Sequence, residues 1–188
     1  MKFHIFTIFP DMYSSTFEEG VIHRGIAKGH VEIFLHNIRD YTNDKHKKVD
    51  DSPFGGGPGM IMKPEPIFNA VETVSKNHNI SKTTPKILLS PQGKQFNHKI
   101  AKELANLSEI ILICGRYEGF DERIRETLAT DEISIGDYIL SGGELASMVI
   151  IDSVSRLIPG VLGSNESPLN DSFYNDLLQF PQYTRTAS

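Results

Sequence analysis

Short segments that are typical of β-strands alternate along this chain with longer segments that are typical of helices. Strands are expected at residues 2–9, 31–38, 86–90, 109–114 and 132–140. Helices are expected at about residues 16–28, 64–76, 97–107, 120–129 and 142–157. The run at 86–90 has a wholly apolar centre, as expected for a strand that is covered on both faces. This alternation predicts an α/β fold with a mainly parallel sheet flanked by helices.

Three loops that contain glycine follow three of the predicted strands. They are Ser90–Gly93, Gly115–Gly119 and Ser141–Gly143. Ligands of parallel sheets bind beyond the carboxyl ends of the strands, so we expect these loops to meet around one pocket. Paired glycines let a ligand approach the backbone, here beside the start of a helix. Taken singly, each loop also fits an ordinary strand-to-helix turn.

Two common nucleotide-binding motifs are missing from the expected places. No GxGxxG pattern opens a helix after the first strand, so a Rossmann dinucleotide site is not supported. Residues 53–60 contain four glycines and two prolines but lack the Gly-Lys-Ser/Thr ending of a P-loop. This segment instead fits a glycine-rich backbone beside a ligand or an RNA strand, or a flexible hairpin.

Charge and composition limit the classes of partner. The net charge of −5 makes the chain as a whole a poor match for nucleic acid. The polar loop 39–52 contains the basic stretch Lys45–Lys48, which could contact phosphates or simply form a solvated loop. A single cysteine, Cys114, excludes an internal disulfide, and the histidines show no metal-ligand spacing. No apolar run approaches the ~20 residues that span a bilayer, so we expect no membrane segment. The single cysteine makes the cytoplasm the expected compartment.

Several longer motifs run through the chain in order. They include Ile8–Met12, Val49–Met60, Ser90–Gly93, Cys114–Arg123, Ser134–Leu145, Asp152–Gly163, Asp171–Phe173 and Tyr183–Arg185. On these motifs the chain closely resembles the bacterial tRNA (guanine-37, N1)-methyltransferases, which are knotted members of the SPOUT class. The motifs cover nearly the whole chain and are specific in combination.

The resemblance implies a fold detail, a cofactor and partners. The C-terminal part of the sheet would form a deep trefoil knot, the cofactor would be S-adenosylmethionine, and a dependence on Mg²⁺ is implied on the same basis. The substrate would be the anticodon loop of tRNA, and the protein would be a homodimer with shared active sites. Residues 1–160 would form the knotted catalytic domain that binds S-adenosylmethionine. Residues 161–188 would form a linker and the start of an absent C-terminal region, so tRNA binding is expected to be weak.

The resemblance also assigns site residues. Asp171 would be the general base that removes the N1 proton of guanine, and Arg156 would stabilise the charge that moves to O6. From the residues alone, Asp171 equally fits a helix N-cap and Arg156 a helix-surface arginine. The cofactor would be bound by Leu89, Ser90, Pro91, Gly115, Tyr117, Glu118, Gly119, Ser134, Ile135, Gly136, Asp137, Tyr138, Ile139, Leu140, Gly142 and Gly143. The RNA would be contacted by Asp50, Lys45, Lys47, Lys48, Gly57 and Ser172. No residue is assigned to a metal.

Two other functions stay open at this point. One is an RNA methyltransferase of the same fold that acts on the ribose 2′-OH, and the other is a non-catalytic dimer that binds the cofactor or RNA.

The chain departs from the family pattern at Leu88, where the pocket wall usually carries an aromatic residue, and at Ala146, where it carries a proline. A short helix is expected at residues 171–180, and residues 161–172 are expected to be disordered without a ligand.

Overall fold

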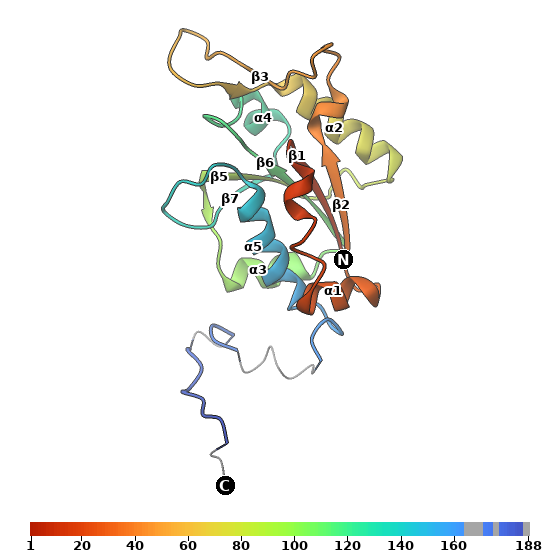
Figure 1. The fold of residues 1–188 in the computed structure, drawn as a ribbon, viewed down its shortest axis with the longest axis vertical. Helices are drawn as coiled ribbons and strands as arrows, with labels where there is room; N and C mark the ends of the chain where they lie inside the picture. Colours follow the sequence, from red (N-terminus) through yellow and green to blue (C-terminus); the bar gives the residue numbers. More distant parts are fainter. Residues whose placement is uncertain (164–170, 175–176, 186–188) are drawn as a thin grey trace.

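The structure is a computed structural model that describes residues 1–163, 171–174 and 177–185. Within these residues the central element is a five-stranded sheet in the order β2-β1-β6-β5-β7 (Figure 1). Its strands are β1 (Lys2–Thr7), β2 (Glu32–Asn37), β5 (Lys86–Gln95), β6 (Glu109–Cys114) and β7 (Asp131–Ser134). Every pairing in this sheet is parallel. The predicted α/β fold with a mainly parallel sheet is confirmed.

Helices cover both faces of this sheet. They are α1 (Gly20–Ala27), α2 (Pro64–Asn77), α3 (His98–Ala105), α4 (Glu122–Thr127) and α5 (Glu144–Ser155), with the 3-10 turns η1 (Pro10–Tyr13) and η2 (Ile38–Tyr41). One core lies under α1, α3 and α5 and contains Leu112, and a second lies under α2 and α4 and contains Ile111. Successive strand residues point to opposite faces, so the apolar strands supply both cores at once.

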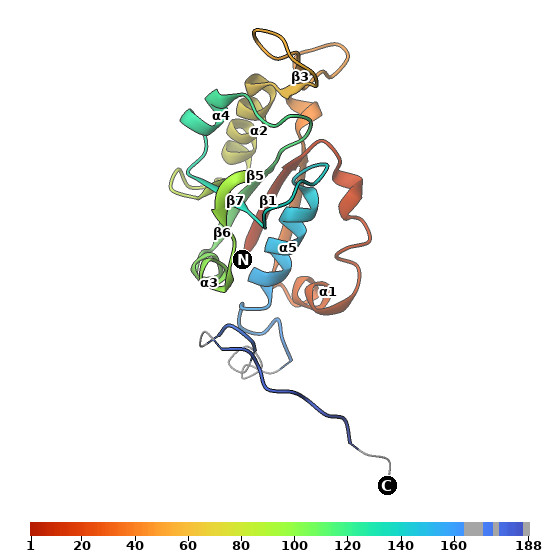
Figure 2. The same cartoon turned by 90° about the vertical axis from the view of Figure 1, so that its left-hand side faces the viewer.

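A small hairpin stands apart from the main sheet. Its strands β3 (Asp50–Asp51) and β4 (Ile61–Met62) pair antiparallel, so the glycine-rich segment lies in the connection of a hairpin. The Met62 N–H donates to the Gly119 carbonyl, and the Glu118 N–H donates to the Met60 carbonyl, both at 2.9 Å. These bonds attach the hairpin to the loop after β6. In Figures 1 and 2 the hairpin stands at one end of the molecule and the C-terminal tail leaves from the other.

Three predicted boundaries are wrong for local physical reasons. The strand expected at 86–90 continues as β5, because a bulge after Leu89 lets Lys94 pair again with β7. A Cβ atom on Gly93 would lie 2.5 Å from the backbone of β7, so only glycine fits there. The strand expected at 132–140 ends at Ser134, whose hydroxyl bonds to the backbone N–H and carbonyl of Gly136 and turns the chain. The first helix begins at Gly20, later than expected.

The tail also differs from expectation. Residues 171–174 form a turn, and residues 177–185 form neither helix nor strand. The predicted disorder of 161–172 falls mainly on residues 164–170, which lie outside the described residues, whereas Val161 is buried against α1. None of the helices in the described part of the chain has the length and apolarity needed to cross a bilayer.

A buried pair of histidines makes this fold sensitive to acid. His4 on β1 and His36 on β2 lie 3.2 Å apart (Nδ1 to Nε2), and the ring of His78 meets both edge-on. Burial, reinforced by repulsion between the histidines, lowers the pKa of His4 and of His36 to about 4, against an opposing attraction from Glu109 at His4. An unfolded histidine titrates near pH 6.5, so the unfolded chain binds more protons between about pH 6.5 and about pH 4.

We therefore expect the free energy of unfolding to be highest above about pH 6.5 and to fall as the pH drops towards about 4. The loss should reach at most about 3 kcal/mol per histidine. Urea unfolding at a series of pH values measures it. The double variant His4→Phe/His36→Phe keeps the stacked rings and should lose this part of the pH dependence. An unchanged slope in that variant would contradict the assignment.

Candidate functional site

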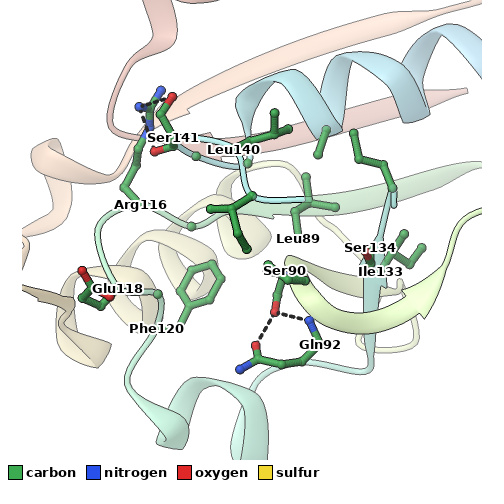
Figure 3. Close-up of a pocket in the computed structure, with 18 of the residues that line it drawn as sticks. Leu89, Ser90, Gln92, Arg116, Glu118, Phe120, Ile133, Ser134, Leu140 and Ser141 are labelled. Atoms are coloured by element: carbon green, nitrogen blue, oxygen red, sulfur yellow. Dashed lines mark hydrogen bonds between the residues drawn. The ribbon is translucent and has the colours of Figure 1, made fainter. Parts of the chain in front are cut away.

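A cavity of about 560 Å³ opens where β5, β6 and β7 meet the segments that follow them (Figure 3). This volume is within the usual range for small-molecule sites. Most of the wall is made by residues 89–92 of β5, residues 115–120 after β6, and residues 133–136 and 138–143 at and after the end of β7. The structure thus brings the three glycine-containing segments around one cavity, with a bulge in place of the first loop.

Almost all the predicted cofactor residues line this cavity. The exception is Asp137, which is exposed on the loop after β7 but lies outside the lining. The lining also contains residues that were not assigned to the cofactor: Gln92, Arg116, Phe120, Glu122, Arg125, Ile133 and Ser141. Ala146, which the family pattern placed in the pocket wall, lines the cavity as expected. The position of Arg116 inside the predicted loop Gly115–Gly119 is the signal that could have identified it. For Glu122 and Arg125, which come from α4, the sequence offers no comparable signal.

Leu88 does not form part of the cavity wall, contrary to the expectation from the family pattern. It is fully buried in the core under α2 and α4, with Ile111 and Ile113. Its neighbour Leu89 lines the cavity instead, because successive residues of a strand point to opposite faces.

The cavity wall combines apolar side chains with accessible backbone groups. Leu89, Ile133 and Leu140 contribute apolar surface. Gly119 and Gly136 have φ angles of +113° and +154°, a conformation that side chains rarely adopt. These turns leave backbone N–H and C=O groups beside apolar surface, an arrangement that suits a ligand with a flat ring and polar edges.

Arg116 ties two parts of the cavity wall to the start of α5. Its Nε donates to Glu144 Oε2 at 2.9 Å, and its Nη1 donates to the Ser141 carbonyl at 3.1 Å. The other carboxylate oxygen of Glu144 accepts a hydrogen bond from the Thr7 hydroxyl at 2.7 Å. Glu144 is fully buried, and both its oxygens are paired. The pair therefore holds the wall in one geometry before a ligand binds.

Cys114, at the end of β6, serves packing rather than covalent chemistry. Its thiol is fully buried and lies 3.5 Å from the Tyr13 hydroxyl, which is 2.6 Å from Ser147 Oγ. Burial raises the pKa of the Cys114 thiol to about 12. The reactive thiolate is therefore not populated near neutral pH.

Arg156 and Asp171 form an ion pair at the opposite end of α5 from the cavity. Arg156 Nη2 lies 2.8 Å from Asp171 Oδ2, and the two side chains are 41% and 37% exposed. The helix α5 has 12 residues, so it separates Arg156 from the cavity by roughly 18 Å along its axis. Within one chain, the predicted catalytic residues and the predicted cofactor residues do not come together.

The predicted RNA contacts fall into two groups. Asp50, Lys45, Lys47, Lys48 and Gly57 lie on or beside the β3–β4 hairpin, where Lys47 pairs with Asp40 at 2.7 Å. Ser172 lies in the tail, where its hydroxyl accepts a hydrogen bond from the Gln179 N–H at 2.9 Å. In the described ranges, no group of three or more histidine, cysteine, aspartate or glutamate side chains could hold a metal ion.

The parallel sheet and the glycine-walled cavity at its strand ends define an α/β protein with a candidate small-molecule site at the usual place for this class. The family model for tRNA (Guanine-1)-methyltransferase TrmD matches residues 1–188, so the chain belongs to this family. A tRNA (guanine-N(1)-)-methyltransferase of Dehalococcoides mccartyi is 58% identical over 185 residues, which are 98% of this chain and 74% of that relative. The Geobacillus kaustophilus enzyme of the same name is 54% identical over 100% of this chain and 75% of that relative.

A solved structure agrees with this assignment. The crystal structure of the tRNA (m1G37) methyltransferase from Aquifex aeolicus matches with a TM-score of 0.82 at 39% sequence identity. The match covers 98% of this chain and 76% of the Aquifex chain.

Proposed function

We propose that this protein transfers a methyl group from S-adenosylmethionine to N1 of guanine 37 in tRNA, beside the anticodon. The observation that carries the proposal is that the family match spans residues 1–188 while the predicted cofactor residues gather around one cavity. The names of the relatives give guanine-N(1) methylation of tRNA, and the name of the Aquifex structure adds position 37. A tRNA substrate also favours a cytoplasmic location.

The cavity fits the cofactor chemically. S-adenosylmethionine has an adenine ring with polar edges, a ribose and a charged methionine end, and when bound it supplies an electrophilic methyl group. Leu89, Ile133 and Leu140 would pack against the ring, while backbone groups near Gly115 and Gly136 would bind its polar edge. A Cβ atom on Gly142 would clash with Arg116, so the wall there has no room for a side chain. A dependence on Mg²⁺ is implied by the family resemblance alone, and no residue is assigned to the ion.

The reaction needs a base and a stabilising cation near the target guanine. N1 of guanine carries a proton, and Asp171 would accept it while negative charge moves towards O6. Arg156 would stabilise that charge, because a guanidinium binds guanine O6 and N7 well. Their contact at 2.8 Å supports a shared role. The target base would leave its stack to reach them, as in other enzymes that modify bases.

We infer that the active site is completed by a second copy of the chain. The length of α5 keeps Arg156 and Asp171 away from the cavity of their own chain. In an isologous dimer, each cavity would receive the Arg156–Asp171 pair of the partner. Apolar surface for such a contact is supplied by Leu145 and Val149 on α5, which are both nearly half-exposed. Further exposed apolar surface comes from Met12 in η1 and from Phe9, which precedes it.

An aspartate at position 149 should therefore weaken the dimer. Burying its charge in the contact is costly, so the dimer dissociation constant of Val149→Asp should rise by about tenfold or more. Sedimentation equilibrium measures the change, and turnover per chain should fall with it at low protein concentration. The control Glu126→Asp alters a side chain on α4 and should leave the dimer unchanged. An unchanged dimer in Val149→Asp would contradict the inferred interface.

A C-terminal knot and the domain division belong to the same proposal. β5 lies between β6 and β7 in the sheet, and after β7 the chain returns to β6, where the Gly143 N–H donates to the Gly115 carbonyl at 2.9 Å. This path supports the threading that the family implies, an exception to the usual rule against knots. Residues 1–160 would form the catalytic domain, and residues 161–188 would form the linker that follows it.

The test is transfer of labelled methyl to tRNA transcripts that carry guanine or adenine at position 37. The chain should be assayed alone and joined to the C-terminal part of the Dehalococcoides relative. We expect 1-methylguanosine from the guanine transcript only, with higher activity for the longer protein. A 2′-O-methylated product would support the ribose methyltransferase instead. Cofactor binding by calorimetry without any turnover would support a non-catalytic binding protein.

A further inference from the structure

One aromatic side chain holds the start of the tail against the body of the protein. The neighbouring tail side chains Phe173 and Leu177 are 60% and 73% exposed. Tyr174, by contrast, is half-buried against α3. Lys102 Nζ lies 4.3 Å from the centroid of its ring, and the ring of His98 meets it edge-on at 6.1 Å. The tail is thus anchored through the ring of Tyr174, in contact with a cation and a second ring.

This anchor lies three residues from Asp171 and is connected to it by one backbone turn. The Tyr174 N–H donates to the Asp171 carbonyl at 3.3 Å, which closes a single turn. The Asp171 carboxylate meets Arg156 at the end of α5, while Tyr174 meets α3. Because α3 and α5 pack together in one core, the two contacts hold the turn at two fixed points.

The ion pair alone is a weak restraint. Both Arg156 and Asp171 are more than a third exposed, and exposed ion pairs stabilise little because water screens them and two long side chains must be ordered. A second contact three residues away restrains the direction in which the Asp171 carboxylate points. General-base catalysis depends on that direction, since a small displacement of a catalytic group lowers the rate steeply.

We propose that Tyr174 is a positioning residue, which docks on His98 and Lys102 of α3 and thereby orients Asp171 for proton removal from guanine. This inference rests on the proposed function, because it takes Asp171 as the base. Tyr174 touches neither the cofactor cavity nor, in this role, the reacting atoms. Tyr174 acts by closing the turn that carries Asp171. Its contacts with α3 are made by the ring and not by the hydroxyl group.

The test compares Tyr174→Ala with Tyr174→Phe in the methyl-transfer assay. Tyr174→Ala should lower kcat by about tenfold to a hundredfold with little change in the KM for tRNA, because positioning acts on the chemical step. Tyr174→Phe keeps the ring and should retain activity close to that of the unaltered protein. Lys102→Met should lower kcat less than Tyr174→Ala does. Lys102→Arg keeps a cation at this position and should therefore keep kcat close to that of the unaltered protein. Calorimetry should show unchanged binding of S-adenosylmethionine in all four variants.

A double-variant comparison separates positioning from a general structural role. In an Asp171→Asn background, Tyr174→Ala should have no further effect on kcat, because the group that it orients is already gone. An additive loss there, or a Tyr174→Ala variant within twofold of the unaltered protein, would overturn the inference. Failure of the unaltered protein, joined to the C-terminal part of the Dehalococcoides relative, to form 1-methylguanosine would instead overturn the proposed function, so the two failures are distinguishable.

Discussion

Replacing Asp171 with asparagine is expected to lower kcat for N1 methylation by about 10²–10⁴-fold, the usual contribution of a positioned general base. Asparagine keeps the size of the side chain and can still accept a hydrogen bond from Arg156, but it cannot take the N1 proton. The cavity is formed by other residues, so the affinity for S-adenosylmethionine should not change. Single-turnover methyl transfer and calorimetry measure the two quantities.

The control for this variant is Asp131→Asn, the same change at an exposed aspartate at the start of β7. It should leave both quantities unaltered. If Asp171→Asn keeps its rate, then no base acts from this position, and the ribose 2′-OH methyltransferase becomes the better interpretation. If Asp171→Asn loses cofactor binding as well, then the carboxylate belongs to the cofactor site and the division of roles proposed here is wrong.

The second large effect is expected on stability, from Glu144→Ala. The Glu144 carboxylate is fully buried and accepts hydrogen bonds from Arg116 and Thr7. Its removal leaves the guanidinium of Arg116, which is only 14% exposed, without its partner. Breaking one side of a buried ion pair typically costs about 3–5 kcal/mol of unfolding free energy. Urea unfolding should show this as a lower midpoint with an unchanged slope.

An exposed ion pair provides the matched control for Glu144→Ala. Glu72 pairs with Lys76 on the surface of α2 at 2.7 Å, and Glu72→Ala should change the stability little, because water screens this pair. The cofactor affinity should also fall in Glu144→Ala, since Arg116 positions the Ser141 carbonyl at the cavity wall. Equal stability of the two variants would show that the buried pair does not hold the wall.

The sequence predicted the class of fold because that class depends on local periodicity. The apolar centre of the segment 86–90 indicated a strand covered on both faces, and β5 supplies both cores. The loop Gly115–Gly119 was predicted as cavity wall because the ends of parallel strands share one edge. The extension of β5 through Pro91 was not predictable, since it depends on how Gly93 meets the backbone of another strand.

The sequence by itself determined the parallel α/β sheet, the family and most of the residues around the cavity, because these follow from short-range patterns and ordered motifs. Only the tertiary structure decided that Leu89 rather than Leu88 faces the cavity, that Arg116 and Glu144 join its walls, and that α5 separates Arg156 from it. The physical reason is the same in each case. Side-chain direction, burial and distance depend on contacts between segments far apart in the chain, and no local pattern encodes them.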